Sequence, residues 1–133
     1  MGKVFLTRSR EPEPEEVEGV QPLADVPWVG EYSFLYPGFV DLRERTGEFI
    51  DPQKDAFFQG ANMDALEAFI HEWSAKAKAQ PESWEQRVGI AYPSREVICR
   101  TTSRNSVLAF LTDVLKAIEA ARASKRGVFF WGE

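Results

Sequence analysis

The single histidine and the single cysteine are the residues best able to transfer a proton or form a covalent bond in this chain. His71 could act as a general base and Cys99 as a nucleophile, provided that a partner group lies within hydrogen-bond reach. The surrounding patterns favour simpler roles. His71 falls between stripe residues of a predicted helix, at its surface, and Cys99 alternates with Val97 and Thr101 in a predicted strand, which is typical of a small buried hydrophobe. We therefore assign no catalytic residue, and a Cys99–His71 dyad is only an alternative.

Three arginines form the one basic constellation of the sequence. Arg95, Arg100 and Arg104 run from a predicted hairpin into a predicted helix, and the stretch CRTTSRNS adds hydroxyl groups and a helix N-terminus. Such groups can hold a phosphate or a carboxylate when their side chains converge. The simpler interpretation is helix capping with surface ion pairs. Both interpretations stay open at this point.

Motifs for metals and cofactors are missing from the sequence. One His and one Cys leave only carboxylates to complete a metal site, and neither a D-x-D-x-D-G loop nor H-E-x-x-H occurs. The phosphate-binding patterns G-x-x-x-x-G-K-[ST] and G-x-G-x-x-G are absent, as is the G-x-S-x-G nucleophile elbow. We predict no metal and no cofactor.

The net charge of −5 belongs to one short tract. Residues 11–20, EPEPEEVEGV, hold five glutamates, and without them 16 acidic residues face 16 basic ones. Pro12, Pro14 and repulsion between the glutamates predict that residues 9–22 form a flexible acidic loop or linker. Such a tract can also attract a basic protein over a long range. The candidate contact residues are Glu11, Glu13, Glu15, Glu16 and Glu18.

Aromatic residues make up 13% of the chain, enough to furnish a contact surface as well as a core. Tyrosine and tryptophan are frequent anchors in protein interfaces. Four of them are expected on neighbouring strands and are our aromatic candidates for partner binding: Tyr32, Tyr36, Trp84 and Tyr92.

Strands are expected in the first half of the chain, because six of the eight prolines lie within its first 52 residues. Residues 3–7 predict a strand, and so does the alternation in residues 31–36. Residues 39–43 and 48–50 flank a turn and predict a hairpin. Phe57 and Phe58 follow in a predicted connection, where they either fill the core or form an apolar contact patch.

The second half predicts two helices, a hairpin and a last strand. The capping-box spacing of Asp64 and Glu67 predicts a helix over residues 64–79, and a second apolar stripe predicts one over 103–126 with Gly127 at its C′ position. Between them, residues 84–92 and 96–102 alternate as a hairpin. Residues 128–131 are apolar on both faces, which indicates an interior strand that can run parallel to a neighbour.

These elements predict an α+β fold with a mixed or antiparallel sheet of about five to six strands and two helices packed on one face. A chain of 133 residues has the size of a single domain spanning residues 1–133. No apolar run has the length of a membrane span, and the first residues lack a secretory pattern, so we expect a cytoplasmic protein with no membrane contact. A neutral body with an acidic arm also disfavours nucleic acid as a partner. The oligomeric state stays open.

The function class follows from size, acidity and missing catalytic motifs. The first hypothesis is a non-enzymatic protein-binding domain, most concretely an immunity- or antitoxin-type inhibitor of a basic partner protein. The alternative is a small anion-binding domain or enzyme that uses Arg95, Arg100 and Arg104.

Overall fold

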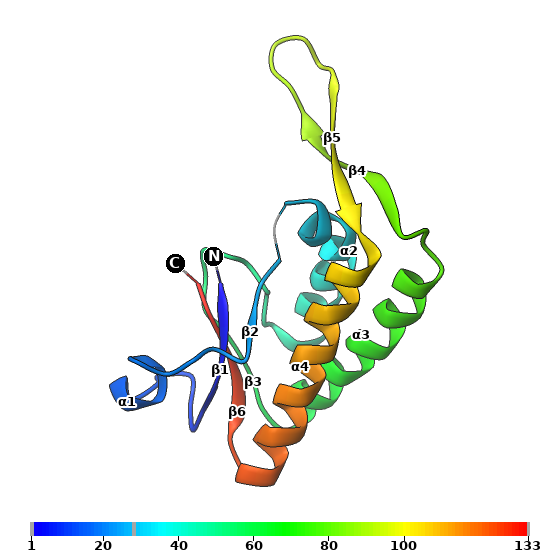
Figure 1. The fold of residues 1–133 in the computed structure, drawn as a ribbon. Helices are drawn as coiled ribbons and strands as arrows, with labels where there is room; N and C mark the ends of the chain where they lie inside the picture. Colours follow the sequence, from blue (N-terminus) through cyan, green and yellow to red (C-terminus); the bar gives the residue numbers. More distant parts are fainter. Residues whose placement is uncertain (1, 28, 133) are drawn as a thin grey trace.

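A computed structural model describes residues 2–27 and 29–132. Within these residues the chain forms an α+β fold with two antiparallel sheets (Figure 1). The elements are β1 (Lys3–Thr7), α1 (Pro14–Val17), β2 (Ala24–Asp25), α2 (Val29–Thr46), β3 (Ala56–Phe58), α3 (Ala61–Lys78), β4 (Ser83–Ile90), β5 (Val97–Ser103), α4 (Arg104–Ser124) and β6 (Gly127–Trp131). The α+β class is as predicted, but the strands divide into two sheets instead of forming one.

The main sheet has four strands in the order β2-β1-β6-β3. The prediction of an interior last strand is confirmed, because β6 pairs with β1 on one side and with β3 on the other. Both pairings are antiparallel, so the suggested parallel crossover is wrong. The reason is that the strand before α4 is β5, which belongs to the other sheet, so α4 does not connect β6 to a strand of its own sheet.

Three helices lie on one side of this sheet, and the short α1 lies on the other (Figure 1). α4 packs against β1, β2 and β6, α3 packs against α4, and α2 packs against α3. Val4 and Phe130 are opposite each other in the sheet and belong to the core under the helices. Three helices in a row therefore lie on this face of the sheet, where the sequence predicted two.

The predicted strand over residues 31–36 and the predicted hairpin over 39–50 are wrong. α2 covers residues 31–36 and the first strand of the predicted hairpin, and it contains Pro37. Residues 48–50 follow α2 without regular secondary structure. The buried residues of α2, Leu35, Phe39 and Leu42, recur at helical spacing, and their burial outweighs the backbone hydrogen bond that the proline ring removes.

The two predicted apolar helices are confirmed, but their ends differ. α3 begins after Gly60, so Asp64 is not its N-cap; Asp64 and Glu67 instead accept hydrogen bonds from Arg122 of α4 at 2.7 and 3.0 Å. Lys125, with φ 57°, ends α4 in the left-handed conformation that was expected of Gly127. Gly127 begins β6, where a Cβ atom would lie 2.9 Å from the backbone oxygen of Phe58 and against the ring of Phe57.

The predicted hairpin in the middle of the chain is confirmed as β4 and β5. It contacts α2 at its base and projects away from the helices (Figure 1). A bulge between Arg87 and Gly89 interrupts its register. Phe57 and Phe58, expected in a connection, belong to β3; Phe58 is buried in the core and Phe57 is half-buried.

Candidate functional site

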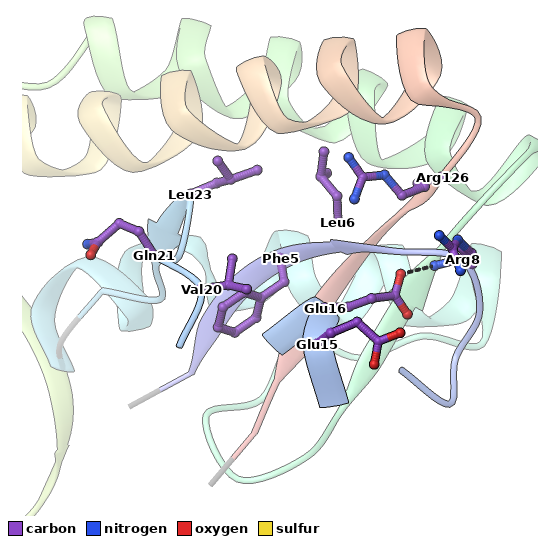
Figure 2. A pocket seen from close by; sticks show the side chains of 9 residues that line it. All are labelled: Phe5, Leu6, Arg8, Glu15, Glu16, Val20, Gln21, Leu23 and Arg126. Atoms are coloured by element: carbon purple, nitrogen blue, oxygen red, sulfur yellow. Dashed lines mark hydrogen bonds between the residues drawn. The ribbon is translucent and has the colours of Figure 1, made fainter. Parts of the chain in front are cut away.

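A groove of about 350 Å³ opens beside β1 (Figure 2). It exists because β2 has only two residues and pairs only with Lys3 and Val4, which leaves the rest of β1 without a strand neighbour on that side. The chain that connects β1 to β2 passes around this gap and forms the opposite wall. The lining residues are Phe5, Leu6, Arg8, Glu15, Glu16, Val20, Gln21, Leu23 and Arg126.

The wall formed by this connecting chain is apolar. Val20 and Leu23 are 42% and 44% exposed, which is high for aliphatic side chains next to a sheet. Figure 2 shows Leu6 and Leu23 directed toward α4, whereas Phe5 points to the other side of β1. Because Phe5 is buried, the apolar surface open in the groove comes from Leu6, Val20 and Leu23.

Backbone groups of β1 also face this groove. The oxygen of Val4 accepts a hydrogen bond from the Leu23 N–H at 2.9 Å, and the Arg8 N–H donates to Glu16 Oε2 at 3.0 Å. Because strand residues alternate, the backbone of Leu6 points to the same edge as those of Val4 and Arg8. An extended chain in the groove would meet the backbone groups of Leu6 at this edge.

Carboxylates dominate the charge around the groove. Glu16 accepts from the N–H groups of Arg8 and Glu13, and this caps the first turn of α1. The other four glutamates of the tract are exposed, and none has an ion-pair partner among the residues that the structure describes: Glu11, Glu13, Glu15 and Glu18. Arg10 is paired with Glu48. Among the lining residues, Glu15 and Glu16 balance Arg8 and Arg126, so the excess of negative charge comes from Glu11, Glu13 and Glu18, which belong to the same tract outside the lining.

The tract holds a short helix, α1, instead of being extended throughout as predicted. The chain before α1 is joined to the body by the ion pair of Arg10 and by the bond of the Arg8 N–H to Glu16. The expected flexibility of residues 9–22 stays a prediction.

The aromatic candidates do not join the glutamates. Tyr32 and Tyr36 lie on α2 with ring centroids 6.0 Å apart, and Trp84 packs on Phe34 at the base of β4, at 5.1 Å. Tyr92 is 89% exposed beyond the end of β4. Figure 1 places the hairpin and α1 at opposite ends of the molecule, so the two predicted parts of one surface are separate surfaces.

Tyr32 and Tyr36 line a second groove, between α2 and the hairpin. Its volume is about 490 Å³, and Ser33, Arg87, Val88 and Gly89 complete the lining. The Tyr32 hydroxyl donates to the Ile50 backbone oxygen at 2.8 Å, which fixes one side of this groove.

Alkaline pH should destabilise the protein through Tyr32. The pKa of Tyr32 is raised from 10.0 to about 12, chiefly because the side chain is buried and to a smaller extent by the charges of Asp51 and Tyr36. Below about pH 10, Tyr32 is protonated in both the folded and the unfolded chain, and its full contribution to stability is present. Between about pH 10 and 12 only the unfolded chain releases the proton, so this contribution is lost as the pH rises.

The check is the free energy of unfolding of Tyr32→Phe at about pH 8 and pH 11. The variant should lose about 1 kcal/mol at the lower pH, from the missing bond to Ile50, and show a weaker decline toward the higher pH than the parent protein. Parallel declines of the two proteins would contradict this role of Tyr32.

The three candidate arginines for an anion do not converge. Arg95 lies in the hairpin turn, Arg100 donates to the Cys99 oxygen at 3.0 Å, and Arg104 donates to the Gln80 oxygen at 3.2 Å. Ser103 caps α4 by accepting from the Ser106 N–H at 3.3 Å. The stretch thus works as a helix cap, and these arginines line neither the groove beside β1 nor the groove between α2 and the hairpin.

The two reactive side chains lie on different elements. Cys99 is exposed on β5, so the expectation that it is buried is wrong; a two-stranded sheet has no second layer to cover that face. His71 is exposed on α3, as expected. Across residues 2–27 and 29–132, no three His, Cys, Asp or Glu side chains are grouped as metal ligands. No helix in the same residues is long and apolar enough to cross a membrane.

Comparison with protein-family models, with curated proteins and with solved structures finds no match for this chain. Function is therefore inferred from the groove, its charge and its exposed side chains. Sequence reasoning found the glutamates but missed the apolar wall of the groove. Isolated Val20 and Leu23, which follow the last glutamate of the tract, were the only signal for it.

Proposed function

We propose that this protein is a non-enzymatic protein-binding domain and that its groove beside β1 receives an extended, basic segment of the partner. The proposal rests on one observation: an apolar wall and an outward-facing strand edge lie beside the acidic tract, which carries four exposed carboxylates without ion-pair partners in the described part of the chain, one of them, Glu15, in the lining of the groove.

Each feature of the groove has a part in the binding. An apolar side chain of the partner would cover Val20 and Leu23, which removes their exposed surface from water. The backbone of the partner segment would pair with Leu6 as an added strand. Lysine or arginine side chains beside it would meet Glu11, Glu13, Glu15 and Glu18, and the field of these carboxylates would speed association at low salt.

The most concrete form of this function is an immunity- or antitoxin-type inhibitor that covers the active site of a basic enzyme in the cytoplasm. Small size, a negative field at one end and a groove that accepts a chain segment support it. A nucleic acid fits less well, because phosphates and the glutamates carry the same charge.

Neutralising the free glutamates should abolish partner capture. The full chain is used as bait in an extract of its source cell, and the bound proteins are identified by mass spectrometry. The variant Glu11→Gln/Glu13→Gln/Glu15→Gln/Glu18→Gln should retain at most about a tenth of a basic partner at low salt, because charged rims set association rates. Capture by the parent protein should fall steeply as salt screens the field.

A variant with the same change in charge is the control. Glu44, Glu72, Glu82 and Glu119 are exposed and lie outside both the acidic tract and the groove beside β1, so their replacement by glutamine should leave capture within about twofold. Equal losses in the two variants, or a captured partner that is not basic, would refute the proposal.

A further inference from the structure

We infer that two copies of this chain associate through the outer edge of β5 and form a four-stranded antiparallel sheet around a two-fold axis at Ile98. This inference goes beyond the proposed function, because β5 lies at the opposite end of the molecule from the groove beside β1 (Figure 1).

The hairpin is an incomplete sheet. β4 and β5 pair only with each other among the described strands, and the hairpin projects into solvent (Figure 1). A two-stranded sheet is marginally stable in water, and a long exposed edge is a template for pairing. Ile90 and Val97 form a cross-strand pair whose members are 50% and 55% exposed. An added pair of strands would extend the sheet beside these side chains.

The backbone of β5 has hydrogen-bonding groups directed outward. Glu96 accepts from the Ala91 N–H at 2.8 Å and the Arg104 N–H donates to the Glu82 oxygen at 3.0 Å, so even-numbered residues bond within the hairpin. By alternation, the backbones of Val97, Cys99 and Thr101 face away from β4. The bond between the Cys99 oxygen and the Arg100 guanidinium fits this direction.

The side chains of residues 96–100 are complementary to themselves. They read Glu-Val-Ile-Cys-Arg, so antiparallel pairing about Ile98 sets Glu96 opposite Arg100 of the second copy, twice by symmetry. Val97 then lies opposite Cys99 of the second copy. The backbone groups of both residues point outward, so the two strands can form hydrogen bonds at this pair.

Other registers lack this match. Pairing about Cys99 sets Ile98 opposite an arginine, and pairing about Arg100 sets two arginines against each other, which is unfavourable. Pairing about Val97 leaves Glu96 opposite an isoleucine. The charges thus select both the partner, a second copy, and the register. On association, Arg100 exchanges its bond to the Cys99 oxygen for the carboxylate of the second copy and frees that oxygen for the new strand.

The test exchanges the two charges. Sedimentation equilibrium of the full chain, kept reduced, should show a reversible dimer at or below about 100 µM protein. Glu96→Arg and Arg100→Glu should each raise the dissociation constant at least about tenfold, because each variant opposes like charges. Mixing the two variants should restore the dimer, as should the double variant Glu96→Arg/Arg100→Glu.

Two controls keep the result specific. Arg87→Glu changes an exposed charge on β4 and should leave the dissociation constant within about twofold. Cys99→Ser should also dimerise, because the two cysteines are diagonal neighbours about 7–8 Å apart in this register. The glutamine variant of the groove should dimerise as the parent does, which separates this test from that of the proposed function.

A parent protein that stays monomeric over this range of concentrations would overturn the inference. So would single variants that dimerise as the parent does, a mixture that stays monomeric, or a dimer that disappears on reduction or with Cys99→Ser.

Discussion

Replacing Gly38 with alanine should lower the free energy of unfolding by about 2–3 kcal/mol. Gly38 is buried in α2, where α2 crosses α3, and an added Cβ atom would overlap the indole of Trp73 and lie 2.6 Å from the ring of Phe69. Trp73 also packs edge to face against Phe34, whose ring centroid lies 5.4 Å away. The aromatic rings or the two helices must therefore shift, and overpacking of a core typically costs this much. The loss should appear even though alanine is the better helix former.

The measurement is urea unfolding, and Gly89→Ala is the matched control. An added Cβ at Gly89 would meet no atom within 4 Å, so its effect should stay within about 0.5 kcal/mol. A Gly38→Ala protein as stable as the parent would show that α2 and α3 are not in close contact at this point.

The same contact explains the largest error of the sequence interpretation. Pro37 and Gly38 together indicate a turn, and the alternation of Tyr32, Phe34 and Tyr36 indicates a strand. In α2 the alternating residues lie on different sides: Tyr32 and Tyr36 are one turn apart, whereas Phe34 packs on Trp73 and Trp84. Burial of the helix against α3 decided the conformation, and that partner is distant in sequence.

Local patterns did predict the elements whose periodicity is unambiguous. The stripes of α3 and α4, the hairpin, β1 and the interior strand β6 all follow from the spacing of apolar residues. The division into two sheets did not follow, because it depends on which strands pair. β6 lies between β1 and β3, and the pairing of Thr7 with Gly127 spans nearly the whole chain.

The groove was unpredictable for the same reason. Arg126 and Arg8 line the same groove because β6 returns beside β1, and Leu23 and Leu6 line it because β2 has only two residues. The glutamates, by contrast, were evident from composition alone. Sequence thus showed the charge of the candidate site but not the surface that the charge surrounds.

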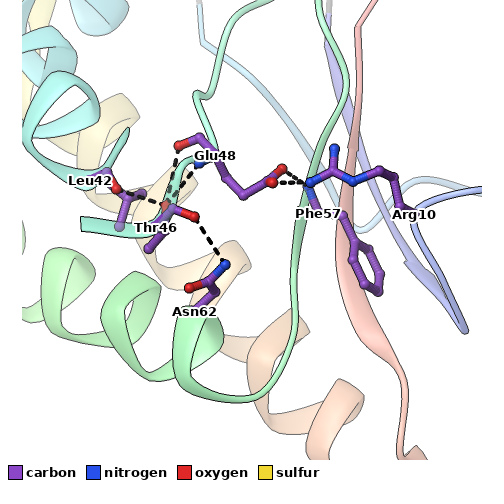
Figure 3. A network of polar contacts seen from close by, with 6 residues as sticks. All are labelled: Arg10, Leu42, Thr46, Glu48, Phe57 and Asn62. Carbon is purple, nitrogen blue, oxygen red and sulfur yellow. Dashed lines mark hydrogen bonds and ion pairs between the residues drawn. The ribbon is translucent and has the colours of Figure 1, made fainter. Parts of the chain in front are cut away.

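Removing the carboxylate of Glu48 should also cost about 3 kcal/mol. This side chain is only 11% exposed, and Oε1 accepts from the Phe57 N–H of β3 at 2.8 Å while Oε2 pairs with Arg10 (Figure 3). The backbone N–H of Glu48 donates to Thr46 Oγ1 at 3.0 Å, at the end of α2. Glu48→Ala leaves a buried N–H without its acceptor and an arginine without its partner, and both losses destabilise the folded chain.

Two further variants separate these contributions. Glu48→Gln keeps an oxygen for the Phe57 N–H and should recover part of the loss, whereas Arg10→Ala removes only a half-exposed ion pair and should cost at most about 1 kcal/mol. Urea unfolding should therefore rank the losses as Glu48→Ala above Glu48→Gln and Arg10→Ala. Because Arg10 joins the chain before α1 to the body, Arg10→Ala should also reduce the amount of basic partner that is captured, although it changes the free energy of unfolding little. A loss in Arg10→Ala as large as that in Glu48→Ala would show instead that the ion pair, and not the bond to β3, stabilises this junction.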